Sequence, residues 1–131
     1  MELRVIVAGS RDFDDYKLLK KKVSEKLSSY DTTNTPVRII SGTARGADQL
    51  GEHFAKSENY LLSKFPADWG LYGKSAGYRR NVEMAQFAVA NDNIGVLIAF
   101  WDGKSKGTKH IIDIANRYGL YVEVIMYAYG E

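Results

Sequence analysis

Leu3 to Ala8 (LRVIVA) is a short apolar run near the N-terminus, and Gly9 follows it directly. Several similar runs come later in the chain and are also apolar almost throughout, which is typical of strands buried on both faces of a sheet. They are Val37 to Ser41 (VRIIS), Tyr60 to Phe65 (YLLSKF), Gly95 to Trp101 (GVLIAFW) and Tyr121 to Met126 (YVEVIM). The sequence therefore predicts five strands.

Between these runs, apolar residues recur every three or four positions, which is the period of a helix that faces a core. The four stripes are Tyr16, Leu19, Val23, Leu27 and Tyr30; Ala47, Leu50 and Phe54; Tyr78, Val82, Ala85 and Val89; and Ile111, Ile114, Ala115 and Tyr118. Strands that alternate with helices require crossover connections and a mostly parallel sheet. We therefore predict an α/β fold: one doubly wound, Rossmann-like domain over residues 1–131, with a mostly parallel five-stranded sheet and helices on both faces.

The composition limits the class of protein. The chain has 131 residues, 45% of them hydrophobic, so it can bury one core without help from metals or disulfides. The absence of cysteine excludes disulfides and thiolate zinc sites and fits a reducing, cytoplasmic location. His53 and His110 show no metal-ligand spacing, so we expect no metal and no cofactor. The N-terminal apolar run is too short for a signal peptide, and no run approaches the roughly 20 residues of a membrane span.

Glycine-rich loops follow three of the predicted strands. They are Gly9 to Asp12 (GSRD), Gly42 to Asp48 (GTARGAD) and Trp101 to Thr108 (WDGKSKGT). Because ligands of open parallel sheets bind at the carboxyl ends of the strands, we expect these loops to meet at one edge. Glycines let backbone N–H groups approach a ligand, and the N-terminus of a following helix favours phosphate. One such loop is often only a turn, but three that also carry Arg, Lys, Ser or Thr predict an anion site.

Gly73-Lys74-Ser75 are the last three residues of the P-loop pattern, which raises the alternative of a nucleotide hydrolase. The P-loop requires a glycine five positions before Gly73, and Asp68 occupies that position. The preceding strand also ends too early for a direct passage from strand to loop to helix. We therefore place Lys74 and Ser75 on a loop before the third helix, with Ser75 as a candidate N-cap.

Arg79, Arg80 and Asn81 occupy the first turns of that helix. An arginine pair beside an asparagine offers fork-shaped donors for phosphate or carboxylate. The alternative is a solvated helix face on which Arg79 pairs with Glu83, four residues later. We predict ligand contacts for Arg80 and Asn81 and leave the role of Arg79 open.

Four blocks of the sequence resemble a known superfamily. They are Ala8 to Phe13 (AGSRDF), Ser41 to Asp48 (SGTARGAD), Ala76 to Asn81 (AGYRRN) with Met84, and the loop from Trp101 to Thr108. As a set they resemble the SLOG superfamily, and within it the small bacterial and phage proteins called YspA-like. The first two blocks are also similar to the Rossmann-like core of DNA-processing protein A. The last two are similar to the LOG cytokinin-activating phosphoribohydrolases.

The resemblance implies a pocket for a nucleotide or a nucleotide-derived phosphorylated ligand, in a protein that acts as a sensor or processor of it. In the LOG enzymes an Arg and a Glu promote cleavage of the N-glycosidic bond between a base and ribose 5′-phosphate. Arg80 falls on the matching Arg, whereas Ile111 occupies the place of the Glu and cannot manage a proton. Hydrolysis of nucleoside phosphates at the N-glycosidic bond is therefore the alternative function.

Other residues near the strand ends are further candidates. Asp102 ends a buried strand beside a glycine-rich loop, where it could contact a ribose hydroxyl or act as an acid or base. Asp48 lies at a helix start, where its charge suits the helix dipole. Trp69 and Trp101 are both expected at strand ends, where an indole can stack on a base. We expect Trp101 to be mainly structural and leave Trp69 open between stacking and packing.

The predicted catalytic residues are Arg80 and Asp102. The predicted ligand-binding residues all lie on the strand-end loops or the helix starts: Gly9, Ser10, Arg11, Gly42, Thr43, Arg45, Gly46, Asp48, Trp69, Arg80, Asn81, Gly103, Ser105, Gly107 and Thr108. The expected partner is a nucleotide-like small molecule. A formal net charge of +2 argues against nucleic acid, including single-stranded DNA, and no membrane partner is expected. A homodimer is an open alternative, because the LOG enzymes dimerise and Tyr127 and Tyr129 could form a contact.

Overall fold

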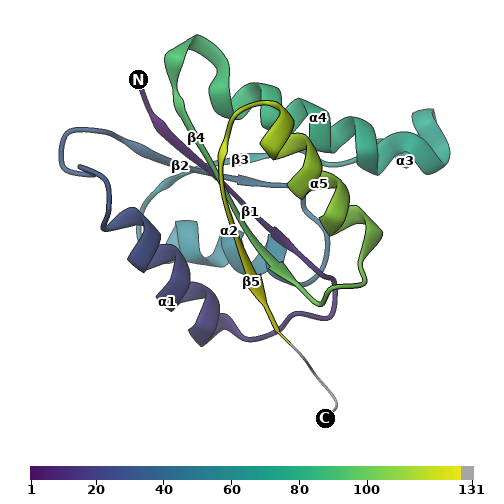
Figure 1. Ribbon diagram of the computed structural model, residues 1–131, viewed down its shortest axis with the longest axis horizontal. Coiled ribbons are helices and arrows are strands. Elements are labelled where there is room, and N and C mark those ends of the chain that lie inside the picture. The colour runs from purple at the N-terminus through teal and green to yellow at the C-terminus, as the bar shows by residue number, and fades with distance from the viewer. Residues whose placement is uncertain (128–131) are drawn as a thin grey trace.

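The computed structural model describes residues 1–127, and all five predicted strands are present in it. The strands form one fully parallel sheet with the order β3-β2-β1-β4-β5 (Figure 1). Their bounds are β1 Leu3–Gly9, β2 Val37–Ser41, β3 Leu61–Lys64, β4 Ile94–Trp101 and β5 Tyr121–Met126. The predicted α/β, Rossmann-like fold is confirmed.

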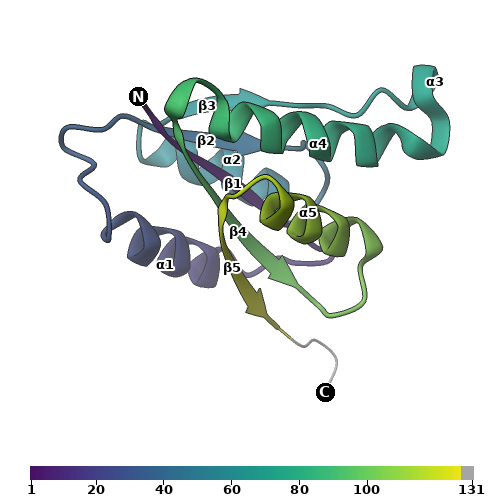
Figure 2. The same ribbon diagram turned by 45° about the horizontal axis from the view of Figure 1, so that its top comes forward.

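Four long helices cover the two faces of the sheet, as predicted. They are α1 Tyr16–Leu27, α2 Ala47–Ser57, α4 Ala76–Val89 and α5 Lys106–Arg117. Two short 3-10 turns, η1 Gly73–Ser75 and η2 Ala90–Asp92, flank α4. A four-residue helix, α3 Trp69–Tyr72, was not predicted and lies at the outer end of α4 (Figures 1 and 2). So short a helix leaves no periodic pattern, and its one local signal is Asp68, whose carboxylate accepts the Leu71 N–H at 3.0 Å.

The sheet separates two apolar cores because side chains alternate along each strand. Leu3, Val5 and Val7 of β1 pack with α1 and α2 on one face. Ile6 and Ala8 of the same strand pack with α4 and α5 on the other. The central strands are therefore apolar on both faces, which explains the unbroken apolar runs of β1 and β4.

The starts of α1 and α4 differ in how they are capped. Asp15 caps α1, because its carboxylate accepts the Leu18 N–H at 3.0 Å. Ser75 does occupy the N-cap position of α4, but its hydroxyl caps no N–H and instead donates to the Tyr72 carbonyl at 3.0 Å. The predicted capping by Ser75 is wrong because the preceding 3-10 turn holds this serine in a helical backbone conformation, which turns the hydroxyl back along the chain.

The predicted apolar stripe of α4 also needs correction. Of the predicted stripe, Ala85 is buried and Val82 and Val89 are partly buried against the core, but Tyr78 is 46% exposed. The fully buried positions also include Asn81, Met84 and Ala88. The helix is therefore rotated relative to the prediction. This rotation carries the polar Asn81 inward.

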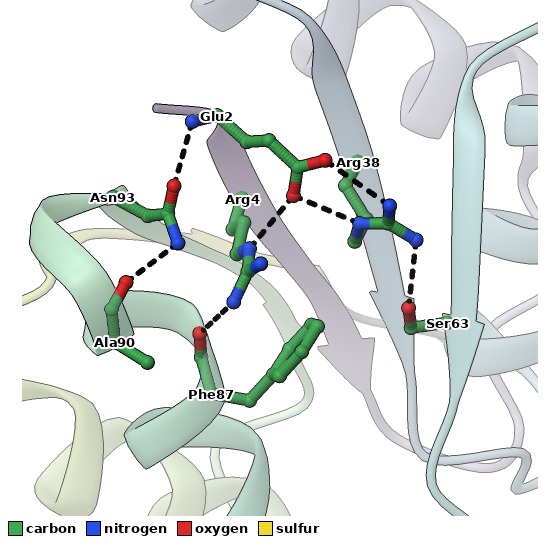
Figure 3. A network of polar contacts seen from close by, with 7 residues as sticks. All are labelled: Glu2, Arg4, Arg38, Ser63, Phe87, Ala90 and Asn93. Carbon is green, nitrogen blue, oxygen red and sulfur yellow. Dashed lines mark hydrogen bonds and ion pairs between the residues drawn. The ribbon is translucent and has the colours of Figure 1, made fainter.

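A polar network ties together the amino ends of the strands (Figure 3). Both Glu2 carboxylate oxygens accept from Arg38, at 2.9 and 3.1 Å, and one also accepts from Arg4 Nε at 2.8 Å. Arg4 further donates to the Phe87 carbonyl at 2.6 Å and stacks over the Phe87 ring, 3.9 Å from its centroid. Arg38 donates to the Ser63 hydroxyl at 3.1 Å. The network thus joins β1, β2, β3 and the end of α4.

We predict that Glu2→Gln weakens the acid dependence of stability. Hydrogen bonds from Arg38 lower the pKa of Glu2 from 4.5 to about 2, with a smaller contribution from Arg4. A lowered carboxylate pKa stabilises the folded protein above pH 4.5, and this contribution is lost as the pH falls towards 2. After allowance for partial exposure, the wild type should lose about 1 kcal/mol more than the variant between pH 6 and pH 3. Urea denaturation at both pH values measures this difference, and equal losses would contradict it.

Candidate functional site

A cavity opens at the point where the strand order reverses. The chain runs outward from β1 through β2 to β3 and then returns to the other side of β1 as β4. Ligands of open α/β sheets bind beside the carboxyl ends of the strands at such a point. We name this the central cavity; its volume is about 230 Å³. It is lined by Ala8, Gly9, Arg11, Ala44, Asp48, Trp69, Lys74, Gly77, Tyr78, Arg80, Asn81, Met84, Ser105, Gly107, Thr108 and Ile111.

Two glycines allow the loops to meet at this edge. A Cβ on Gly9 would lie 2.3 Å from the Phe100 carbonyl oxygen and 2.8 Å from Ala47 Cβ, so α2 begins against the end of β1. Gly46 has φ +80°, and a Cβ there would lie 2.4 Å from the Ser10 carbonyl oxygen. Larger residues at either position would push the loops apart.

Arg80 reaches the cavity from α4 and is held by two contacts within the chain. Its Nη1 donates to the Gly42 carbonyl, and its Nε donates to Asn81 Oδ1 at 3.0 Å. Burial lowers the pKa of Arg80, an effect that the Asp48 carboxyl opposes and the Arg11 charge adds to. The guanidinium is thus partly desolvated and already oriented before any ligand arrives.

Asp48 is the one carboxyl group among the residues that line the central cavity. It is only 5% exposed, and its Oδ2 accepts the Ala44 N–H at 3.2 Å. Burial raises the pKa of Asp48 to about 6, although the Ala44 N–H, Arg80 and Arg11 oppose the shift. Gly42 separates the two side chains: a Cβ on it would lie 2.8 Å from both Arg80 Nη1 and Asp48 Oδ2.

Asn81 links α4 to α5 across the cavity wall. Its Nδ2 lies 3.1 Å from His110 Nδ1 and 3.4 Å from the Gly107 carbonyl oxygen. The His110 ring also packs on Tyr78, with ring centroids 4.3 Å apart. Burial lowers the pKa of His110, which favours the neutral ring that can accept the Asn81 N–H.

The β4–α5 loop builds the opposite wall. Ser105 is the N-cap of α5, and its Oγ accepts from the Thr108 N–H at 3.3 Å and from the Thr108 hydroxyl at 3.1 Å. Asp102 Oδ1 accepts the N–H groups of Lys104 and Ser105 at 2.8 and 2.9 Å, and these bonds lower the pKa of Asp102. The Asp102 carboxylate therefore shapes this loop.

A second cavity of about 310 Å³ adjoins the first, and we name it the arginine lobe. It is lined by Arg11, Gly42, Thr43, Ala44, Arg45, Pro66, Ala67, Trp69 and Arg80. Thr43 has φ +68°, a conformation that β-branched residues rarely adopt. Trp69 is 52% exposed and faces both cavities.

Comparison with known proteins gives two matches and no similar solved structure. Residues 3–72, which are 70 of the 131 residues, match the YAcAr family, described as the YspA, cpYpsA-related SLOG family. The chain belongs to this family. It is also 31% identical over 126 residues to the Gene 61 protein of Mycobacterium phage D29, with 91% of this chain and 93% of that protein covered. No solved structure matches. The predicted YspA-like SLOG resemblance is thereby confirmed.

In this SLOG chain, most of the predicted site residues lie together. Nine of them line the central cavity: Gly9, Arg11, Asp48, Trp69, Arg80, Asn81, Ser105, Gly107 and Thr108. Three more line only the arginine lobe: Gly42, Thr43 and Arg45. The remaining four, Ser10, Gly46, Asp102 and Gly103, line neither cavity. Ser10 is buried, and its hydroxyl accepts the Asp102 N–H at 3.2 Å, so these residues support the walls. The acid or base role of Asp102 stays a prediction.

Several residues that line the site were not predicted to be part of it. Lys74 and Tyr78 line the central cavity, although Lys74 was assigned to a connecting loop and Tyr78 to the core. The apolar floor is made by Met84 and Ile111 together with Ala8. The sequence did point to Met84, which belongs to one of the SLOG-like blocks, and to Ile111, which occupies the position of the LOG Glu. No feature of the sequence predicted the contact of His110 with Asn81, because it joins residues 29 positions apart.

Residues 1–127 contain neither a candidate membrane span nor a candidate metal site. Within that range, no helix has both the length and the apolar content that spanning a bilayer requires. In the same part of the chain, no three acidic or histidine side chains gather as metal ligands would.

Tyr127 donates to Asp12 at 2.6 Å and packs on Phe13, whereas Tyr129 lies outside the described residues.

We predict that Asp48→Asn removes a pH dependence of opposite sign to that of Glu2. A raised carboxyl pKa stabilises the fold at low pH, and this contribution is lost as the pH rises through about 6. Between pH 4 and pH 7 the wild type should lose about 2 kcal/mol relative to Asp48→Asn. Asparagine can still accept the Ala44 N–H. Denaturant unfolding at several pH values tests this, and a constant difference between the two proteins would contradict it.

Proposed function

We propose that the protein binds a nucleotide or a nucleotide-derived phosphorylated ligand at the carboxyl edge of the sheet, as its sensor or processor. The observation that carries the proposal is the composition of the central cavity. Arg80, Asn81 and Thr108 face the same space as an apolar floor of Met84 and Ile111. A site for a nucleotide needs both kinds of wall, one for the phosphate and one for the sugar and base.

The phosphate is expected between α4 and the start of α5. Arg80 supplies a fixed charge, and Thr108 and Gly107 lie in the first turn of α5, where the positive end of the helix dipole favours an anion. Asn81 braces the two helices against one another through Gly107 and His110. Arginine is well suited here because its planar fork matches the geometry of phosphate.

The base and sugar are expected over the floor of the cavity. Ala8, Met84 and Ile111 are buried and apolar, so they offer no competing polar contacts. Trp69 lies at the rim with half of its surface exposed, where its indole can stack on a base. Membership of the SLOG family supports a nucleotide-related ligand. Such a ligand agrees with a cavity that has one polar wall and one apolar floor.

The proposal predicts that Arg80→Ala lowers the affinity for nucleoside monophosphates by about 10- to 100-fold, because a charge-assisted contact to phosphate is lost. Arg79→Ala is the matched control: it removes the same charge from the preceding position of α4, where the exposed Arg79 donates from Nε to the Ser75 hydroxyl at 3.1 Å. Isothermal titration with the four ribonucleoside 5′-monophosphates measures both variants. Native mass spectrometry of freshly purified protein would identify a ligand that copurifies. If no nucleotide binds, or if both variants lose affinity equally, the proposal fails.

A second candidate function, N-glycosidic hydrolysis of a nucleoside phosphate, is favoured by one observation. Ile111 stands where the LOG enzymes carry a Glu, but Asp48 faces the same cavity with its pKa raised to about 6. A carboxyl group in that range can donate a proton near neutral pH. Asp48 would protonate the departing base as the N-glycosidic bond breaks, while water attacks C1′ of the ribose and gives up a proton that restores the Asp48 acid. The products are free base and ribose 5-phosphate.

This reaction predicts release of free base, detectable by chromatography after incubation with nucleoside monophosphates. Asp48→Asn should lower that release by about a hundredfold or more while retaining binding, because the amide cannot donate the proton that the base requires. Tight binding by the wild type without any release of base would exclude the hydrolase and leave the binding function standing.

A further inference from the structure

The arginine lobe differs in charge from the central cavity. Arg11, Arg45 and Arg80 line it, and no acidic residue does. A pocket with three guanidinium groups and no carboxylate is complementary to an anion of more than one charge. The lobe holds about 310 Å³, which is ample for a phosphate group and its surroundings.

The arginines of the lobe retain donors that the described part of the chain does not use. Within residues 1–127, Arg11 and Arg45 form no ion pair and no side-chain hydrogen bond. Arg80 bonds through Nε and Nη1, and its Nη2 has no hydrogen-bond acceptor among the same residues. Donors therefore face the lobe from the β1–α1 loop, the β2–α2 loop and α4.

The charges of the lobe also repel one another. Arg11 lowers the pKa of Arg80, which is the effect of a like charge close by. Asp48, whose carboxyl interacts electrostatically with both arginines, lines the central cavity and not the lobe. An anion in the lobe would relieve this repulsion, whereas a neutral or cationic ligand would not.

The lobe and the central cavity are continuous. Arg11, Ala44, Trp69 and Arg80 line both of them. Together the two volumes fall within the roughly 300–1,000 Å³ of small-molecule sites, whereas the central cavity alone lies below that range. One ligand can therefore fill both and meet a phosphate-binding wall at each end.

We infer that the arginine lobe is a second anion subsite and that the ligand is a nucleotide with a second phosphate group, which Arg45 and Arg11 bind. This inference rests on the proposed function, because it assigns the first phosphate to the central cavity. The second phosphate is either adjacent to the first, as in a nucleoside diphosphate, or separated from it by the sugar, as in a nucleoside 3′,5′-bisphosphate. Both share the chemistry that the lobe recognises.

Arg45 is the residue that tests the inference, because it lines the lobe and not the central cavity. It is exposed on a loop, so Arg45→Ala should fold as the wild type does. Arg117→Ala is the charge-matched control, since Arg117 is an exposed residue in the last turn of α5, at the opposite end of that helix from Thr108. Arg45→Lys keeps the charge but loses the fork.

The experiment compares the affinities for AMP, ADP and adenosine 3′,5′-bisphosphate by titration calorimetry at one fixed salt concentration, with the guanosine, cytidine and uridine counterparts in parallel. We expect at least one of the two-phosphate ligands to bind ten or more times as tightly as the monophosphate with the same base. Arg45→Ala should reduce that gain to about twofold and leave the affinity for the monophosphate unchanged within about twofold. Arg45→Lys should retain part of the gain, and Arg117→Ala all of it.

The outcomes separate the two proposals. Equal affinity of the wild type for one and two phosphates, or a gain that survives in Arg45→Ala, overturns the second subsite while leaving the binding of monophosphates intact. If Arg117→Ala reduces the gain in affinity from the second phosphate as much as Arg45→Ala does, the gain depends only on net charge. That result also overturns the second subsite. If no nucleotide of the panel binds, the proposed function falls and the second subsite falls with it.

Discussion

The site depends on the close approach of two loops that only glycine allows. At Gly46 the β2–α2 loop passes so near the β1–α1 loop that a Cβ would lie 2.4 Å from the Ser10 carbonyl oxygen. At Gly9 the end of β1 is equally tight against β4 and the start of α2. These contacts draw Arg11, Arg45 and the Asp48 carboxyl towards Arg80 of α4, which comes from the other face of the sheet. Without them the arginines would have no shared cavity.

Charged side chains approach this site from both faces of the sheet, and their burial shifts their pKa values. Arg80 and Asp48 are partly or almost fully removed from water, and burial shifts each pKa towards the neutral form of the group. Gly42 lies between them, and its carbonyl accepts from Arg80, so the guanidinium is fixed without a direct ion pair. A site in which cations exceed ionised carboxylates is prepared for an anionic ligand.

The two ends of the sheet use charge differently. At the amino ends, Glu2 pairs with Arg4 and Arg38, and the hydrogen bonds of this network are satisfied within the chain. At the carboxyl ends, Arg11 and Arg45 have no such partner in residues 1–127. The first end therefore joins strands and stabilises the fold, whereas the second carries guanidinium donors that we propose bind a ligand. This division agrees with the general location of ligand sites in parallel sheets.

The sequence by itself determined the strands, the four long helices, the fold class and the glycine-rich loops, because these depend on local apolar period and on residue type. It also determined that Arg80 and Thr108 belong near one edge, since parallel strands end on the same side. Only the tertiary structure decided the rotation of α4 that buries Asn81, the contact of Asn81 with His110, and the burial of Asp48. Each of these depends on packing between segments distant in the chain, which no local pattern encodes. The separation of the arginine lobe from the central cavity was likewise decided by how three loops and α4 pack, rather than by any one of them.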